Sequence, residues 1–395
     1  MLKFLHKKHL MQLPHLYRQL INQLRQWITP QDQRHLQSVS EAVAAILQSG
    51  NASLNRWLPF LSHRPCTARS HLARLSYLVR NPHINAETFY ATLLRQFLQA
   101  FVGADLLLTL DTSMLWDQFC LIQVCLVWGG RSITLAQVVL EHGSATVAFE
   151  DYGPVLAQAL SVLPQQSRVT LLADRGFEHG ELMRWCERQD WSWLIRAKSD
   201  LRITLPTGVT HPVNALLPPV EQAYLFPNVT VLGDITAHLA TATLPNAQEP
   251  WAVLSNRSPS VQTFACYGKR FGGIEPHFKD YKSAAFDIID SHLRDAAALT
   301  GLFLLLDIAT LIALILGMLL VRSGQRQTLD AHLERGLSFL QLGLRYLQQC
   351  CYLGDLLPPL EPLPPQNPPP ACASKSKRER LEVQIQFSRV TTFSS

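Results

Sequence analysis

The chain has 395 residues, which is long enough for two or three domains with separate cores. Hydrophobic residues make up 47% of the chain and charged residues only 16%, and this composition excludes an intrinsically disordered protein. The net charge of +5 is unevenly spread, because residues 1–80 sum to +9 and the remaining residues to −4. A basic block joined to a slightly acidic body predicts a module that binds a polyanion, although a solvated basic surface has the same composition.

Cysteine usage and the first residues favour a cytoplasmic protein. The eight cysteines show no CxxC spacing, so neither a zinc site nor a disulfide framework is expected. The N-terminal stretch MLKFLHKKHL has too few apolar residues for a signal peptide.

Residues 1–100 are predicted to form a helical DNA-binding domain. Asn85 is a candidate N-cap, and Phe89, Leu93 and Phe97 follow it at helical spacing. Short helical stretches with interspersed arginines occupy residues 53–80. They fit a helix-turn-helix-like DNA reader, and a plain helical bundle with basic surfaces fits almost as well.

Strand patterns begin near residue 104. The apolar runs 105–111 and 168–174 each end at an acid, and 119–140 predicts two strands joined through Gly129 and Gly130. Helices are expected over 151–163 and 180–189, and a further strand over 191–198. The order strand-strand-strand-helix-strand-helix-strand predicts an α/β fold with a ribonuclease H-like core.

The second half of the chain completes the predicted domain organisation. A catalytic domain is expected over 101–330, with a β-rich insertion at about 200–255 and helical signal returning at about Glu275. A C-terminal helix is expected over 331–356. Residues 357–395 form a Pro-rich and basic tail, whose short basic cluster consists of Lys375, Lys377, Arg378 and Arg380.

The apolar run at 301–321 is long enough to span a bilayer. Asp307 lies within it, at a cost of roughly 3 kcal/mol on membrane-insertion scales, which does not by itself exclude a span. Because the run directly follows the predicted active-site helix, we interpret it as a buried core helix and expect no membrane partner.

Asp111 and Asp174 each end a buried strand of one predicted sheet. Ligands of α/β sheets collect at the carboxyl ends of strands, so these two acids are expected side by side. Adjacent carboxylates resist joint ionisation unless a cation compensates them, and hard oxygen ligands suit Mg²⁺, with Mn²⁺ possible. A third carboxylate would complete a two-metal site for phosphoryl transfer.

The stretch YGKRFGGIEPHFKDYKS (267–283) resembles the Tyr-Arg-Glu-Lys signature of DDE-type transposases of the fourth insertion-sequence group. Tyr267 and Arg270 keep the first interval of that signature, and Glu275 and Lys282 keep the last. Four residues rather than three separate Arg270 from Glu275, and we expect the Gly-Gly pair to absorb the extra one in a loop before the helix. The segments LTLDTSML and LLADRGF are similar to the family's two aspartate motifs, and the similarity covers roughly residues 105–325.

The resemblance implies a transposase that nicks the ends of its own mobile element and joins the freed 3′-hydroxyl to target DNA. It implies that Asp111, Asp174 and Glu275 hold the metal ions, and that DNA near the cut is contacted by Tyr267, Arg270 and Lys282. Since two element ends must be held together, it also implies a homodimer on DNA.

Two further cations are candidates from their positions alone. Lys279 lies on nearly the same predicted helix face as Lys282, where both would meet phosphates. Arg175, next to Asp174, would touch phosphate or merely offset carboxylate charge. His277, which has no partner at ligand spacing, is expected at the surface or just behind the site.

Three other functions remain open at this level. A ribonuclease H-like nuclease would share the metals and lack strand transfer. A decayed, catalytically inactive transposase would keep only DNA binding. A membrane protein would use residues 301–321 as its span.

Overall fold

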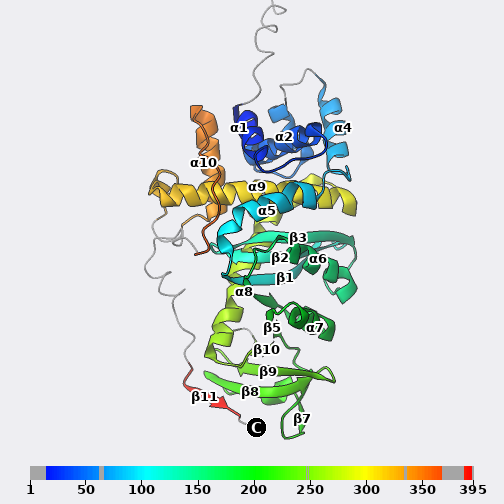
Figure 1. Cartoon of the computed structure of the whole chain (residues 1–395), viewed down its shortest axis with the longest axis vertical. Helices are drawn as coiled ribbons and strands as arrows, with labels where there is room; N and C mark the ends of the chain where they lie inside the picture. The colour runs from blue at the N-terminus through cyan, green and yellow to red at the C-terminus, as the bar shows by residue number, and fades with distance from the viewer. Residues whose placement is uncertain are drawn as a thin grey trace, which may run out of the picture.

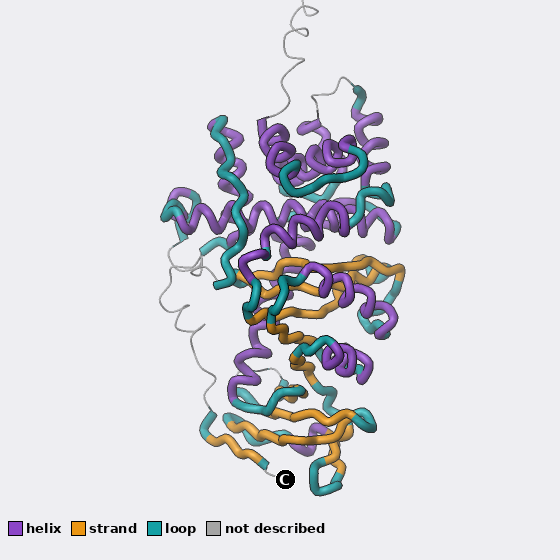
Figure 2. Tube along the Cα trace, in the orientation of Figure 1, coloured by secondary structure: helices purple, strands orange, loops and turns teal. Residues whose placement is uncertain are grey.

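The structure is a computed structural model that describes residues 15–61, 66–245, 247, 249–332, 336–366 and 387–393. The basic cluster predicted at 375–380 lies outside the described residues. The N-terminal helices gather at one end of the molecule and the strands lie toward the other, with one long helix running between them and further helices beside the strands (Figure 1, Figure 2).

Five strands form the half of the sheet nearest the helices: β1 (Asp105–Leu115), β2 (Phe119–Trp128), β3 (Arg131–Glu141), β4 (Arg168–Ala173) and β5 (Ser192–Arg196). Their spatial order is β3-β2-β1-β4-β5, with β1, β2 and β3 antiparallel and with β4 parallel to both β1 and β5. Gly129 and Gly130 both have positive φ, as a two-residue hairpin turn requires. Helices α6 (Phe149–Val162) and α7 (Gly180–Arg188) follow β3 and β4, so the predicted order of strands and helices is confirmed.

The strand-rich segment predicted at 200–255 extends the same sheet. It contributes β6 (Arg202–Thr204), β7 (Thr210–Pro212), β8 (Gln222–Val231), β9 (Ile235–Ala242) and β10 (Trp251–Ser255). The order continues β5-β10-β9-β8-β6-β7, and β10 joins the two halves by pairing antiparallel with β5. An unpredicted strand near the C-terminus, β11 (Arg389–Thr392), pairs parallel with β8.

Helices alone form the regular structure of the described N-terminal residues: α1 (His15–Leu24), α2 (Gln33–Ser49), α3 (Leu54–Trp57), α4 (Ala68–Leu78) and α5 (Thr92–Phe97), with short 3-10 and π turns between them. The Asn85 side chain accepts a hydrogen bond from the Thr88 N–H at 3.0 Å, as expected of an N-cap. Phe89, Leu93 and Phe97 are buried, which confirms the predicted apolar stripe.

The long apolar segment forms α9 (Ala296–Arg322), the one described helix that is long and apolar enough to cross a membrane by length and composition. Its most apolar window is 89% buried within the protein, where it packs against α2, β3 and α10 (Phe339–Leu353). Asp307 is buried within it, so the prediction of a core helix is confirmed. One hydrophobic core extends from Leu16 to Leu363 and includes residues of the N-terminal helices, the sheet and α9.

Candidate active site

Strand register places the two predicted aspartates next to each other. The parallel pairing of β1 with β4 ends at Leu110 and Ala173, so Asp111 and Asp174 are the next residue on each strand. The prediction that Asp111 ends its strand is wrong, because β1 continues to Leu115 through antiparallel pairing with β2. The parallel ladder thus ends just before Asp111, even though the strand itself continues.

The two carboxylates differ in exposure. The side chain of Asp111 is only 12% exposed, whereas that of Asp174 is 40% exposed. Asp174 directly follows β4, and its carboxylate accepts a hydrogen bond from the Gly176 N–H at 2.8 Å. One acid is therefore held inside the sheet and the other at the solvent boundary.

Helix α8 (Val261–Lys279) carries the signature residues across this sheet. The prediction of a loop around Gly272 and Gly273 is wrong, because both lie inside the helix, which begins fourteen residues before Glu275. A Cβ on Gly273 would meet Val127 and Ser132, so the glycine allows the helix to lie close to β2 and β3.

The extra residue in the signature therefore places Glu275 on a different side of α8 from the buried residues. Tyr267, Arg270, Ile274 and His277 recur at intervals of three and four residues and are all buried. Glu275 lies five residues after Arg270, which is about 140° around a regular helix, and it is exposed. Ile274 stands at the position where the family signature has its glutamate.

Arg270 brings α8 into contact with both aspartates. Its Nη2 lies 2.7 Å from Asp111 Oδ2 and 3.8 Å from Asp174 Oδ2. The Arg270 side chain is 6% exposed, so solvent screens the pair with Asp111 little.

Asp111 is electrostatically coupled to the other predicted ligands. Burial raises the pKa of Asp111 to about 6, and the Arg270 guanidinium opposes this rise. The charges of Asp174 and Glu275 raise the pKa of Asp111 further. The charge of Glu275 therefore reaches the acid pair although its side chain is exposed.

The donor set fits a divalent cation at two of the three predicted acids. Asp111 and Asp174 offer adjacent hard oxygens, which suit Mg²⁺ or Mn²⁺. Within the described ranges, no three His, Cys, Asp or Glu side chains lie together in a group that could hold a metal ion. Glu275 would have to approach the pair to complete a three-carboxylate site.

The remaining predicted residues have different surroundings. Tyr267 is buried, and its hydroxyl has no hydrogen-bond partner among the described residues. Lys279 is exposed, whereas Lys282 is half-buried in a π-helical turn, Asp280–Ala284, that follows α8. This turn interrupts the regular helix on which Lys279 and Lys282 were predicted to share nearly one face. Arg175 is exposed and pairs with Glu249 at 3.2 Å.

A buried polar network behind α8 was not predicted. His277 lies 3.1 Å from Thr134 Oγ1, and burial lowers its pKa to about 3. Of the two places expected for it, at the surface or just behind the site, the surface is therefore wrong. The Arg131 Nε donates to Asp280 at 2.8 Å. The buried residues of α8 recur every three or four positions from Tyr267, and His277, Asp280 and Tyr281 continue this pattern. The pattern could have been recognised in the sequence if the helix had been predicted to begin at Val261.

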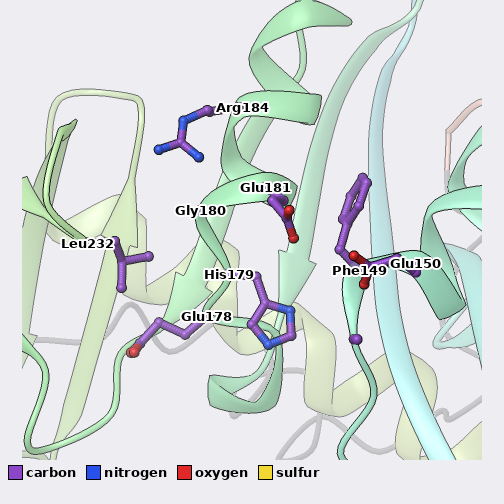
Figure 3. Close-up of a pocket in the computed structure, with 9 residues that line it drawn as sticks. Phe149, Glu150, Glu178, His179, Gly180, Glu181, Arg184 and Leu232 are labelled. Atoms are coloured by element: carbon purple, nitrogen blue, oxygen red, sulfur yellow. The ribbon is translucent and has the colours of Figure 1, made fainter.

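A cavity of about 470 Å³ lies between the first turns of α6 and α7 (Figure 3). Glu150, Glu178 and Glu181 line it together with Arg184, and Leu232 of the β8–β9 turn closes one side. None of the predicted site residues lines this cavity. Three acids against one arginine make it a poor site for a polyanion.

Comparisons with known proteins were made against families, curated proteins and solved structures. None of the curated proteins matches the chain. A structure of piggyBac transposase, in a synaptic complex with hairpin DNA, is similar at a TM-score of 0.42 and 11% identity, covering 95% of this chain and 84% of that one. Residues 118–313, just under half of the chain, match the family model described as a transposase DDE domain. This match contains Asp174, Arg270 and Glu275, and it supports a transposase of the DDE type.

Proposed function

We propose that this protein is a DNA transposase of the DDE type that cleaves and joins DNA strands at the ends of an insertion sequence. The observation that carries the proposal is the strand register that puts Asp111 beside Asp174, with Arg270 of α8 reaching both carboxylates. The family match over residues 118–313 supports the same function. We further propose a ribonuclease H-like core over β1–β5 and membership of the fourth insertion-sequence group.

In this proposal Asp111 and Asp174 hold the divalent cation, with Glu275 as the third acid. A bound Mg²⁺ or Mn²⁺ activates the attacking oxygen and stabilises charge on the phosphoryl group. The half-exposed Asp174 lies where a DNA strand can reach it, and Asp111 behind it is shielded from water. The positively charged side chains of Lys279, Lys282 and Arg175 contact phosphates of the bound strand. Such contacts position the DNA without reading its sequence.

The partners that follow are the element ends, the target DNA and a second copy of the chain. Cut-and-paste transposition requires two ends to be held together, which a homodimer would do. The basic N-terminal segment supplies the charge for sequence-independent contact with DNA.

A second candidate function is DNA binding without cleavage, in a transposase that has lost activity. The exposed side chain of Glu275 and the buried Ile274 at the family's glutamate position favour it. The two candidates differ in whether Glu275 contributes to cleavage.

The first prediction separates these candidates with Asp111→Asn, Asp174→Asn and Glu275→Gln, assayed for Mg²⁺-dependent cleavage of element-end DNA. Each substitution should lower the rate by about 100-fold or more, because a lost metal ligand removes several kcal/mol of transition-state stabilisation. DNA binding should largely persist. Asp105→Asn is a matched control, since Asp105 lies on the same strand and its exposed carboxylate pairs with Arg168.

Two outcomes would contradict the proposed cleavage activity. Full activity of Asp174→Asn would remove the carboxylate site. A wild-type protein that binds element ends without cutting them would establish the inactive form.

A further inference from the structure

The acid pair already has a cation, and the chain itself supplies it. The Arg270 guanidinium lies 2.7 Å from Asp111 and 3.8 Å from Asp174, at the face of the pair that α8 covers. The single guanidinium offsets one of the two negative charges of the pair without a metal ion. A divalent cation that bound both acids through its usual short contacts would compete with Arg270 for the same oxygens.

The helix register explains why an arginine occupies this place. Arg270 belongs to the buried stripe of α8 that faces the sheet, whereas Glu275 does not. The guanidinium of Arg270 therefore reaches the two aspartates, while the carboxylate of Glu275 remains exposed. The described arrangement suits a site without metal, in which α8 contributes positive rather than negative charge.

We propose that Arg270 is a built-in counter-ion that closes the Asp111–Asp174 pair to divalent cations until the phosphate backbone of DNA draws the guanidinium away. This inference rests on the proposed function and adds its regulation. Metal binding and the Arg270 contact exclude each other, so the protein without DNA has weak affinity for the metal. The acid pair opens when a polyanion offers the guanidinium another partner.

Unused donors near the pair show what could attract Arg270. The Arg270 Nε and the Tyr267 hydroxyl are both buried and have no hydrogen-bond partner among the described residues. Buried donors without partners cost free energy in the free protein, so a state that satisfies them is favoured by the same amount. A phosphate oxygen accepts from guanidinium and hydroxyl donors, and arginine matches its geometry well.

The cost of opening sets how strongly the site is closed. Removing a guanidinium from a buried carboxylate leaves that charge uncompensated, which is unfavourable unless another cation arrives. The apparent metal affinity of the free protein is reduced in proportion to the fraction of molecules in the open state. Replacing Arg270 with a neutral residue should remove this reduction.

The test measures Mn²⁺ binding to the full chain by isothermal titration calorimetry in the absence of DNA. Arg270→Gln should bind Mn²⁺ at least tenfold more tightly than the wild type. Arg270→Lys should fall between them, because an ammonium keeps the charge but is a compact point charge without the planar fork. Arg184→Gln is the matched control: its guanidinium pairs with Asp234 at 2.6 Å, away from the acid pair, so its affinity should equal that of the wild type. The double variant Asp111→Asn, Arg270→Gln should lose the tight binding.

Equal or weaker Mn²⁺ binding by Arg270→Gln, with its circular dichroism unchanged, would overturn the inference. If that variant does not fold, unchanged affinity in Arg270→Lys would overturn it equally. The titration is repeated with a short double-stranded oligonucleotide, whose own Mn²⁺ binding is subtracted. The oligonucleotide should raise the Mn²⁺ affinity of the wild type and leave that of Arg270→Gln unchanged. An unchanged Mn²⁺ affinity of the wild type would contradict the role of DNA. Failure of every variant to bind Mn²⁺ would remove the proposed function as well. Equal binding by the wild type and Arg270→Gln, with loss of binding in the double variant, would remove only the role of Arg270.

Discussion

Asp307 lies in the middle of the long apolar helix α9, where uncharged side chains donate hydrogen bonds to its carboxylate. The Gln137 amide and the Tyr281 hydroxyl each donate to one of its carboxylate oxygens. Burial raises the pKa of Asp307 to about 7, and these hydrogen bonds only partly oppose the rise. Because Tyr281 belongs to the turn that follows α8, Asp307 links the core helix to the helix that carries Arg270.

Replacing Asp307 with Asn should therefore alter how stability depends on pH. The folded pKa of about 7 exceeds the unfolded value near 4, so the native state keeps a proton that the unfolded state loses. The contribution of Asp307 is fully present below about pH 4 and is lost as pH rises to about 7. Asn cannot ionise, so the stability of Asp307→Asn relative to the wild type should increase across this window, by up to a few kcal/mol. Urea unfolding at pH 4, 6 and 8 measures this difference, and a constant value would contradict the raised pKa.

Among the elements, α8 shows where local sequence signals were insufficient. The strands that carry the aspartates were predictable because they are apolar runs bounded by turns and acids. The part of α8 before Glu275 contains Gly268, Gly272 and Gly273, and glycine is a poor helix former, so the start of the helix was placed too late. Packing of the buried stripe against the sheet overrides that local preference. Because the helix was predicted to begin near Glu275, the position of Glu275 relative to the buried residues of α8 could not be predicted.

Pairing between distant strands was the other feature that local patterns did not reveal. The β-rich segment at 200–255 was predictable from its composition, but its attachment to β5 through β10 was not. Neither was the addition of β11 to the edge of β8. Strand preference reflects packing against neighbours, which the sequence of one strand does not specify.

Helices α9 and α10 approach each other so closely that glycine is required at the crossing. A Cβ on Gly343 would overlap the Ala313 carbonyl oxygen, and a Cβ on Gly317 would overlap that of Phe339. These neighbours are backbone atoms of packed helices, so neither can move without shifting an element.

Gly343→Ala should consequently destabilise the protein, by about 1–3 kcal/mol, as overpacking of a close contact does. Gly272→Ala is the matched control, because Gly272 is also helical but faces open space, and alanine is the better helix former. Thermal unfolding should give a lower Tm for the first variant and an equal or higher Tm for the second. Equal Tm values for the two variants would contradict the close contact between α9 and α10 at Gly343.

At the scale of the whole molecule, the N-terminal helices share one core with α9 and the segment after α10. Leu357 and Leu360 donate backbone hydrogen bonds to the side chains of Gln19 and Gln23 of α1, at 2.6 and 3.0 Å. The Trp128 indole donates to Pro364 at 3.0 Å, so the same segment also contacts the sheet. A fragment of residues 1–100 would expose the surface that α9 covers, and DNA binding is therefore best tested in the intact chain.

The basic N-terminal segment offers two arginines on one helix with different predicted roles. Arg69 is exposed on α4, whereas Arg74 pairs with the buried Glu41. Arg69→Gln should weaken binding of element-end DNA and lower the salt slope by about one unit, with Tm unchanged. Arg74→Gln should lower Tm, because it removes the guanidinium that Glu41 faces. Filter binding at several salt concentrations and thermal unfolding distinguish the two, and an unchanged slope for Arg69→Gln would place DNA recognition elsewhere.

In the proposed mechanism, the Asp174 carboxylate holds the metal ion that drives strand cleavage. Asp174→Cys tests it directly, because a thiolate is a poor ligand for Mg²⁺ and a better one for the softer Mn²⁺. This variant should bind element-end DNA, fail to cleave it in Mg²⁺, and regain part of its activity in Mn²⁺. Full cleavage in Mg²⁺, or no recovery in Mn²⁺ by a folded and DNA-bound variant, would contradict it.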